Sequence, residues 1–222
     1  GSINTTYTSV NTTSGFSISS YTGSGANATI GHGLGVTPNV VLVKCLSSTG
    51  NWKMHHASEA PITSFNLNTT ASIISTASVF NSMATLNSSV FSLGTEGDTN
   101  SSGLTYIAYC FRNVQGFSKM GYYTGNGNAD GIFNYTGFKP SWIMIKRTDS
   151  ANQWIMLNNK MSLYNNNTGD ELYADSSAVQ NSFVDGGADF LSNGFKLRGT
   201  NGSVNLNGGS YIYMAFAEAP LV

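Results

Sequence analysis

The chain has 222 residues with a formal net charge of -1, and only 9% of them are charged, against about a quarter in an average soluble domain. The ten Lys and Arg residues form no basic stripe, which argues against nucleic-acid binding, and no apolar run reaches the roughly 18 residues of a membrane-inserted helix. The polarity comes instead from 30 Ser, 25 Asn and 22 Thr residues. Because Thr and aromatic residues favour strands while Asn, Ser and Gly favour turns, this composition predicts an all-β fold.

The first half of the chain predicts short strands joined by polar turns. Residues 1–14 are interpreted as an N-terminal lead-in. After Pro38, the apolar run NVVLVKCL (39–46) and the segment NWKMHH (51–56) flank the turn-like sequence SSTGN, which predicts a strand-turn-strand hairpin. Further strands are predicted at Phe16–Tyr21, Ala28–Gly31, Val90–Leu93 and Tyr106–Phe111.

The second half of the chain repeats the pattern of the first. GFSISSYTG begins at Gly15 and GFSKMGYYTG at Gly116, an offset of 101 residues that grows to 102 within the motif. The offset of 102 then holds for three further pairs, Pro38 and Pro140, Lys44 and Lys146, and Trp52 and Trp154. The closing segments YIAYCF (106–111) and YIYMAF (211–216) match at an offset of 105. A chance match would not keep register in this way, so the repeat predicts two tandem homologous units, 15–113 and 116–222.

The matching hairpin of the second unit consists of SWIMIKRT (141–148) and QWIMLN (153–158). Several short strands with Gly, Asn and Ser turns indicate that each unit is a β-sandwich or jelly roll, and we expect the two units to pack together. Residues 57–88 and 158–188 differ between the copies and are interpreted as variable loops. A short helix is predicted near Asp170–Val179.

The cysteines and histidines favour structural roles. Cys45 and Cys110 lie in apolar β-like runs, which predicts two buried free thiols rather than a disulfide or a metal site. His32, His55 and His56 could form a metal pair or a catalytic base, but a turn residue and strand-end residues are the favoured interpretation. Adjacent residues on a strand point to opposite faces, so His55 and His56 cannot bind one ion from a regular strand.

Aromatic and Asn side chains near turns supply the candidate contacts for a ligand. Trp52 and Trp154 occupy equivalent strand positions, which favours a role in the core. The candidate ligand-binding residues are Tyr122, Tyr123, Tyr164, Asn165, Asn166, Asn167 and Tyr173. Asp170 and Asp175 follow an oxygen-rich loop and offer a calcium option, although the spacing does not match an EF-hand. No other metal site, no cofactor and no catalytic residue is predicted, because a glycosidase would need two acids in one cleft.

Long stretches of both copies resemble a known family. The stretches are YTGSGANATIGHGLGVTPNVVLVK in the first copy, and YIAYCFRNVQGFSKMGYYTGNGNADGIFNYTGFKPSWIMIKRTD with the closing GFKLRGTNGSVNLNGGSYIYMAFAEAP in the second. They resemble a repeated domain of uncharacterised function in tail-fibre and other structural proteins of bacteriophages, many of them marine. The resemblance covers about residues 15–220 and is weakest between Ala57 and Asn87. It implies a virion protein assembled in the cytoplasm of a bacterial host, and it supplies no catalytic residue.

Two functions follow as expectations. The first is a tail-fibre or tail-tip domain that attaches to a glycan or another receptor on the host surface, through neutral Asn, Ser, Thr and Tyr side chains. The second is a structural virion component without a ligand, such as a capsid decoration or a fibre spacer. Other virion proteins are the remaining expected partners, and a homotrimer is an option for a fibre. An enzyme is not expected.

Overall fold

The computed structural model describes residues 1–161, 168–184 and 186–220. The protein is all-β, with 44% of its residues in strands and 5% in helices, which confirms the predicted class. The chain divides into two compact units. Unit 1 comprises Gly1–Leu67 and Ile73–Asn113, and unit 2 comprises Asn68–Ser72 and Val114–Val222.

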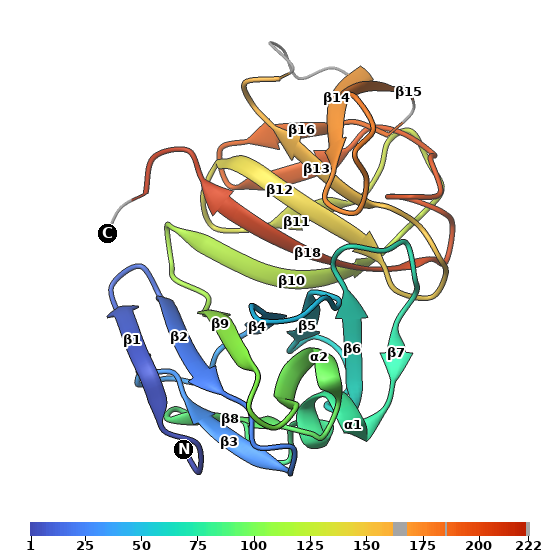
Figure 1. Cartoon of the computed structure of the whole chain (residues 1–222). Coiled ribbons are helices and arrows are strands. Elements are labelled where there is room, and N and C mark those ends of the chain that lie inside the picture. Colours follow the sequence, from blue (N-terminus) through green and yellow to red (C-terminus); the bar gives the residue numbers. More distant parts are fainter. Residues whose placement is uncertain (162–167, 185, 221–222) are drawn as a thin grey trace. The chain divides into compact units, whose positions relative to one another are not determined.

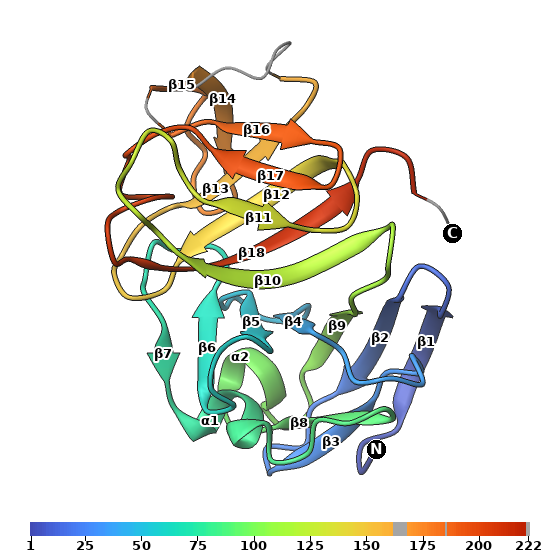
Figure 2. The same cartoon turned by 180° about the vertical axis from the view of Figure 1, so that it is seen from behind.

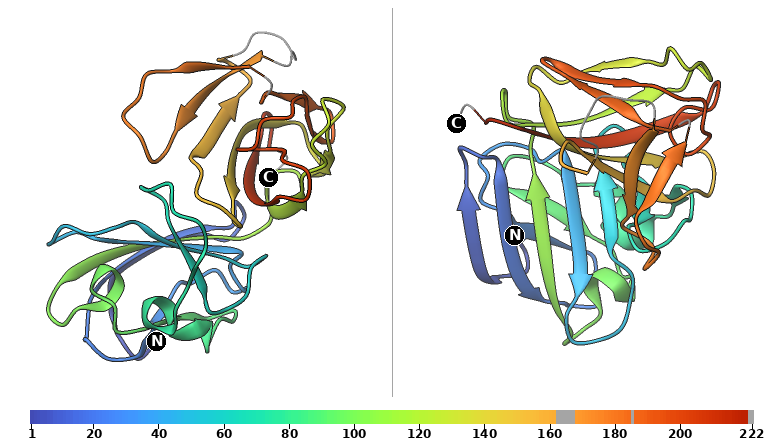
Figure 3. Two further views of the ribbon diagram at one scale, coloured as in Figure 1. Left: turned by 90° about the vertical axis from the view of Figure 1, so that its right-hand side faces the viewer. Right: turned by 90° about the horizontal axis from the view of Figure 1, so that it is seen from above.

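Unit 1 is built on a seven-stranded sheet with the order β1-β2-β9-β4-β5-β6-β7. Its strands are β1 (Thr5–Asn11), β2 (Phe16–Thr22), β4 (Val40–Cys45), β5 (Lys53–His56), β6 (Thr63–Asn66), β7 (Ile74–Ser75) and β9 (Thr105–Phe111). The right-hand view in Figure 3 shows blue β1 and β2 beside green β9 and light-blue β4. A second sheet consists of β3 (Ala28–Gly31) and β8 (Val90–Leu93). Three short helical segments complete the unit, α1 (Ala77–Phe80), η1 (Asn81–Met83) and α2 (Gly97–Asn100) (Figure 1).

The core of unit 1 lies between its two sheets. Every second residue of β2 and β9 is buried, the alternation that a strand with one covered face requires. Val41, Val43 and Ala108 from the large sheet pack with Ile30 and Phe91 from the small sheet in one cluster of buried side chains. The predicted strands of this half are confirmed, as is the hairpin, which is formed by β4 and β5. Residues 1–14 differ from the expected lead-in, because β1 adds to the edge of β2.

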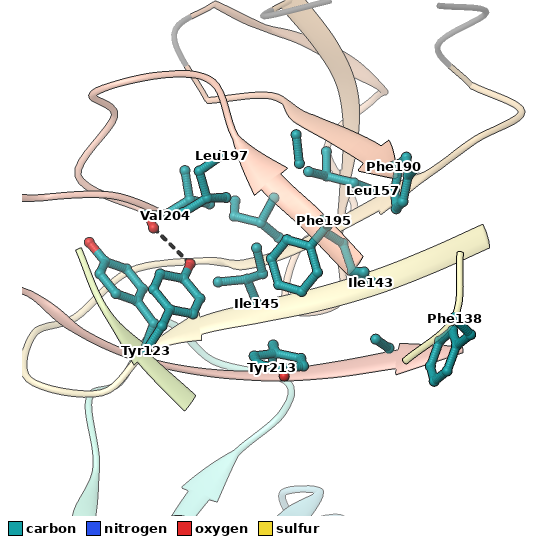
Figure 4. Packing of buried hydrophobic residues seen from close by; sticks show 14 residues of the cluster. Tyr123, Phe138, Ile143, Ile145, Leu157, Phe190, Phe195, Leu197, Val204 and Tyr213 are labelled. Atoms are coloured by element: carbon teal, nitrogen blue, oxygen red, sulfur yellow. Dashed lines mark hydrogen bonds between the residues drawn. The ribbon is translucent and has the colours of Figure 1, made fainter. Parts of the chain in front are cut away.

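Unit 2 has the same sandwich-like construction. Its larger sheet has the order β10-β18-β12-β13-β14-β15 and a second sheet has the order β11-β17-β16 (Figure 2). The larger sheet contains β10 (Ser118–Thr124), β12 (Pro140–Arg147), β13 (Trp154–Asn158), β14 (Thr168–Tyr173), β15 (Asn181–Val184) and β18 (Ser210–Ala217). The smaller sheet contains β11 (Phe133–Tyr135), β16 (Ala188–Leu191) and β17 (Gly194–Leu197). Ile143, Ile145 and Tyr213 from the large sheet pack against Phe195 and Leu197 from the small one (Figure 4).

The two units arrange their strands in the same order. The series β2-β9-β4-β5-β6-β7 of unit 1 is matched in unit 2 by β10-β18-β12-β13-β14-β15. Tyr21 on β2 lies opposite Tyr106 on β9, and Tyr123 on β10 lies opposite Tyr211 on β18. Both ring pairs are stacked, with centroids 5.3 Å and 4.9 Å apart. The units differ at one edge, since β1 pairs with β2 whereas β10 ends its sheet.

Buried polar side chains also make matching hydrogen bonds. Asn100 and Asn205 are both fully buried. Nδ2 of Asn100 donates to two backbone carbonyls at 2.6 and 2.8 Å, and Nδ2 of Asn205 donates to two others at 3.0 and 2.8 Å. Oδ1 of each accepts a backbone N–H, at 2.8 Å and 2.9 Å. Each amide therefore joins a loop to its neighbour in the same way, at an offset of 105 residues.

The predicted helix near Asp170–Val179 is wrong. Residues Thr168–Tyr173 form β14, which pairs with β13 on one side and with β15 on the other. Pairing with neighbouring strands outweighs the weak helical preference of a short polar segment. The other divergent stretch, 57–88, contains β6 and β7 and the segment α1 rather than loops alone.

Candidate binding surface

Exposed aromatic side chains are the feature that points to a ligand. Tyr7 is 78% exposed, Tyr122 71%, Tyr135 65% and Phe133 41%. Tyr7 belongs to β1 and Tyr122 to β10, while Phe133 and Tyr135 belong to β11. Tyr7 lies on a strand that is exposed on both faces, whereas Tyr122, Phe133 and Tyr135 lie next to buried residues of their strands, and each of these open rings is a candidate contact residue.

Phe133 and Tyr135 lie together on the outer face of the small sheet of unit 2. Asn134 between them is buried and lies opposite Phe195, which is fully buried in the core. Since alternate residues of a strand point to opposite faces, the two flanking rings share the face turned away from the core. Phe133 lies opposite Lys196 and Tyr135 opposite Gly194 on β17.

A glycine fixes the position of the Phe133 ring. A Cβ atom at Gly194 would lie 2.9 Å from Cε2 and Cζ of Phe133 and 2.2 Å from the carbonyl oxygen of Asn134. Both distances are too short for a real side chain, so only glycine lets the ring lie this close to the strand. The ring thus lies over Gly194 of the neighbouring strand.

Four charged side chains form a chain of ion pairs that includes Lys196, the cross-strand neighbour of Phe133. Nζ of Lys196 is 2.8 Å from Oδ1 of Asp130, and Nη1 of Arg198 is 3.3 Å from the same oxygen. Nε of Arg198 also contacts Oδ2 of Asp189. The hydrogen bond from Lys196 lowers the pKa of the Asp130 carboxyl, so that group is ionised at neutral pH.

Buried Asn205 holds the loop that carries Asp130. Its Nδ2 donates to the carbonyl oxygen of Asn128 at 3.0 Å and to Oδ1 of Asn126 at 3.0 Å. Oδ1 of Asn128 in turn accepts the backbone N–H of Asp130 at 2.9 Å. The carboxylate is therefore anchored through two layers of hydrogen bonds to the interior of unit 2.

Comparison with known proteins places the chain in a family. A family model described as Domain of unknown function (DUF7483) matches residues 1–220. The chain belongs to this family. One DUF7483 model spans both units, so the family as it is defined contains the pair rather than a single unit. No curated protein and no solved structure matches the chain.

Two of the predicted contact residues of this DUF7483 chain, Tyr122 and Tyr123, point to opposite faces of their strand. Tyr122 is exposed as expected, but Tyr123 is only 6% exposed and its Oη donates to the carbonyl oxygen of Val204 at 2.7 Å (Figure 4). Neighbouring residues of β10 point to opposite faces, which turns Tyr123 into the core and corrects its assignment to the surface. Tyr164, Asn165, Asn166 and Asn167 lie outside the described residues.

Tyr173 is half-buried and takes part in a polar group with Glu171. Its Oη donates to Oε1 of Glu171, and Nδ2 of Asn181 donates to the same oxygen at 3.5 Å. Glu171 is 2% exposed, and burial raises the pKa of its carboxyl. Tyr173 also packs against the core of unit 2, so its position has a structural explanation.

The described positions of the acidic residues give little support to the predicted calcium site. Oδ1 of Asp175 accepts the backbone N–H of Trp154 at 2.8 Å, which is a structural contact. Within residues 1–161, 168–184 and 186–220, no three His, Cys, Asp or Glu side chains gather as a metal site would require. Calcium at Asp170 and Asp175 stays a prediction, because the preceding loop is outside those ranges.

No helix within residues 1–161, 168–184 and 186–220 is long and apolar enough to cross a membrane.

The histidines and cysteines of the DUF7483 chain are buried in unit 1. His32, His55 and His56 are at most 2% exposed. Nδ1 of His55 lies 3.2 Å from the carbonyl oxygen of Thr63, and burial lowers the pKa of this imidazole. Cys45 and Cys110 are buried free thiols, as predicted, and burial raises the pKa of Cys110 to about 12.

The pair Phe133 and Tyr135 was not predicted as a site. The segment GIFNYTG carries aromatic residues on both sides of Asn134, whereas the first copy has ATIG in its matching strand. This difference between the copies is the signal that would have found the two rings.

Proposed function

We propose that this chain is a bacteriophage virion protein, a tail-fibre or tail-tip domain that attaches to the bacterial surface by binding glycan. The observation that supports this proposal most directly is the exposure of aromatic rings on rigid strands, with Tyr122 and Tyr135 both at least 65% exposed. The resemblance of both halves to phage tail-fibre sequences supplies the biological setting.

The surface chemistry suits a neutral sugar. Aromatic rings can cover the apolar C–H face of a pyranose, and Asn, Ser and Thr side chains can hydrogen-bond its hydroxyl groups. Only 9% of the residues are charged, and taking neutral polar groups out of water costs less than taking charges out of water. A glycan can therefore be bound without a large desolvation penalty.

We also propose that the two units are tandem copies of one ancestral β-sandwich. The shared strand order, the two stacked tyrosine pairs and the matching amides of Asn100 and Asn205 support a duplication. In this view the copies keep the scaffold and differ in what they present on it, which is how a duplicated scaffold acquires a binding surface.

A structural virion component is the second candidate. The edge strand β1 favours it, because nearly all of its side chains are exposed, including Tyr7 at 78% and Val10 at 44%. An exposed edge strand is able to pair with another chain, as neighbouring copies in a fibre or a decorated capsid would do.

Binding of the purified chain to intact candidate host cells and to their extracted surface polysaccharide tests the proposal, with and without calcium. Saturable binding to both is expected, and a requirement for calcium that is lost in Asp170→Asn/Asp175→Asn would support an ion at Asp170 and Asp175. A folded chain that binds neither cells nor polysaccharide across a panel of hosts would favour the structural component.

A further inference from the structure

We propose that the outer face of the small sheet of unit 2 is the saccharide-binding site of this chain and that it takes a neutral hexose. The sugar would stack on Phe133 and Tyr135, and its hydroxyl groups would bond to the charged groups around Asp130. This inference rests on the proposed glycan-binding function and assigns that function to a site.

The strand pair β3-β8 of unit 1 corresponds to β11-β17 of unit 2 and forms without aromatic rings at the two positions. Ile30 lies opposite fully buried Phe91 in unit 1, as Asn134 lies opposite fully buried Phe195 in unit 2. This register places Thr29 of unit 1 at the position of Phe133. By the same register, Gly31 occupies the position of Tyr135. Open aromatic rings at these two positions therefore call for a role other than folding.

The site needs little rearrangement to receive a ring. Gly194 leaves room for Phe133 to lie against the strand, since a Cβ there would approach the ring to 2.9 Å. Residues 133 and 135 are two apart on one strand, which separates them by about 6.8 Å, so both rings lie on one face within the span of a single sugar unit or two. Side chains already held in place lose less entropy on binding than free ones.

The hydrogen-bonding groups begin next to Phe133. Lys196 is the direct cross-strand neighbour of Phe133, and its Nζ contacts Oδ1 of Asp130 at 2.8 Å. The Asp130 side chain is 76% exposed, and its contacts within the described ranges all use Oδ1. Oδ2 of Asp130 can thus accept from a sugar hydroxyl while Lys196 and Arg198 donate to another.

The charge at the site selects for a neutral ligand. Asp130 and Asp189 balance Lys196 and Arg198, so the four groups have no net charge at neutral pH. A phosphate or a sulfated or sialylated sugar would have to compete with two carboxylates already paired to the cations. A neutral hexose bonds to such paired charges without breaking the pairs.

An array of immobilised oligosaccharides tests the site, with neutral hexose chains as one arm and sialylated and sulfated chains as the other. The wild-type chain is expected to bind neutral members. The double variant Phe133→Thr/Tyr135→Thr, which gives both positions the residue type of Thr29, should bind them at least about tenfold more weakly. Asp130→Asn should weaken binding several-fold.

Leu46→Thr is the control, because Leu46 is also a large exposed apolar side chain, 58% exposed, and is not one of the candidate contact residues. This control should bind as the wild type does, while Tyr7→Thr and Tyr122→Thr test the two exposed rings that the proposal leaves outside the site. Urea unfolding checks that all variants are folded, and Tyr135→Thr alone serves if the double variant is not.

The outcomes separate the site from the function. Neutral-sugar binding that survives the double variant, or that is lost in Tyr122→Thr instead, would overturn the site and leave glycan attachment standing. Binding restricted to the charged arm would overturn the assignment to a neutral hexose. A folded wild-type chain that binds nothing on the array and no host polysaccharide would overturn glycan attachment itself, and the site with it.

Discussion

Adjacent aromatic residues show how far single positions can be predicted from this sequence. Trp154 was expected in the core and is 1% exposed, whereas its partner Trp52 is only half-buried and stacks on Tyr109 with centroids 6.0 Å apart. Tyr122 and Tyr123 are the same residue type, so only the strand register decides which of them is buried. That register depends on pairing with β18, far away along the chain.

The exposure of Phe133 and Tyr135 could not be predicted from the sequence for a related reason. In the order Phe133, Asn134, Tyr135, hydrophobic patterning would put the aromatic residues inside and the Asn outside. The structure has the opposite arrangement, and the buried Asn134 amide nitrogen has no hydrogen-bond partner among the described residues. Departures from the pattern at a cost in stability are typical of functional positions.

Buried His55 should make stability depend on pH. Its folded-state pKa is lowered, mainly by burial, so below about pH 6.5 the unfolded chain binds a proton that the folded chain does not. The free energy of unfolding should therefore fall as the pH is lowered from 7.5 to 5, by at most about 1.4 kcal/mol per pH unit for this residue.

Urea unfolding of the wild type and of His55→Gln over that range measures the contribution. The variant retains an N–H donor for the carbonyl oxygen of Thr63, and its unfolding should depend less on pH. Glu171 has a raised pKa and acts in the opposite direction, so the difference between the two proteins is the quantity to compare. Identical pH profiles would contradict the prediction.

At the scale of elements, the segments with strong alternation were predictable and the divergent ones were not. β2, β3, β8 and β9 were expected almost at their observed bounds because each contains β-branched or aromatic residues and is flanked by turn residues. β14 lacks this pattern, and it is a strand because β13 and β15 supply its backbone partners. Local sequence cannot reveal partners that come from elsewhere in the chain.

The pairing of β11 with β17 should depend on Gly194. In Gly194→Ala the new methyl group would meet the carbonyl oxygen of Asn134 and the Phe133 ring, so the strands must separate. We expect a loss of about 1–3 kcal/mol in the free energy of unfolding.

Gly202→Ala is the control for that change, because its Cβ would meet only Nη1 of Arg147, at 3.8 Å. Chemical denaturation compares the two variants with the wild type. Equal stability of Gly194→Ala and Gly202→Ala would show that β11 is not held as closely as the structure has it.

At the scale of the whole molecule, the internal repeat was the most informative feature of the sequence. It led to two units of about a hundred residues, and the structure divides at Asn113 and Val114. It did not reveal that residues 68–72 group with unit 2, because this short polar segment has no counterpart that the offset identifies. The added strand β1 was likewise invisible, since nothing in the second copy matches it.

If the units are copies, equivalent residues should be equally important. Asn100→Ala and Asn205→Ala each leave buried backbone groups without the hydrogen bonds that the amide had made. We expect each variant to lose at least about 2 kcal/mol in the free energy of unfolding. Asn207→Ala removes an exposed side chain and should cost less than about 0.5 kcal/mol. Thermal and urea unfolding measure all three, and a large loss in only one of the two buried positions would argue against equivalent roles.

Both cysteines of the chain belong to unit 1, and neither is accessible in the folded state. Cys110 lies on β9 opposite Val41, and burial raises the pKa of its thiol to about 12. The thiol is therefore protonated at neutral pH. An alkylating reagent must reach the sulfur to react with it, so a folded unit 1, which buries both cysteines, protects them from modification. Cysteine alkylation therefore reports the opening of unit 1, and unit 2, which contains no cysteine, does not react with the same reagent.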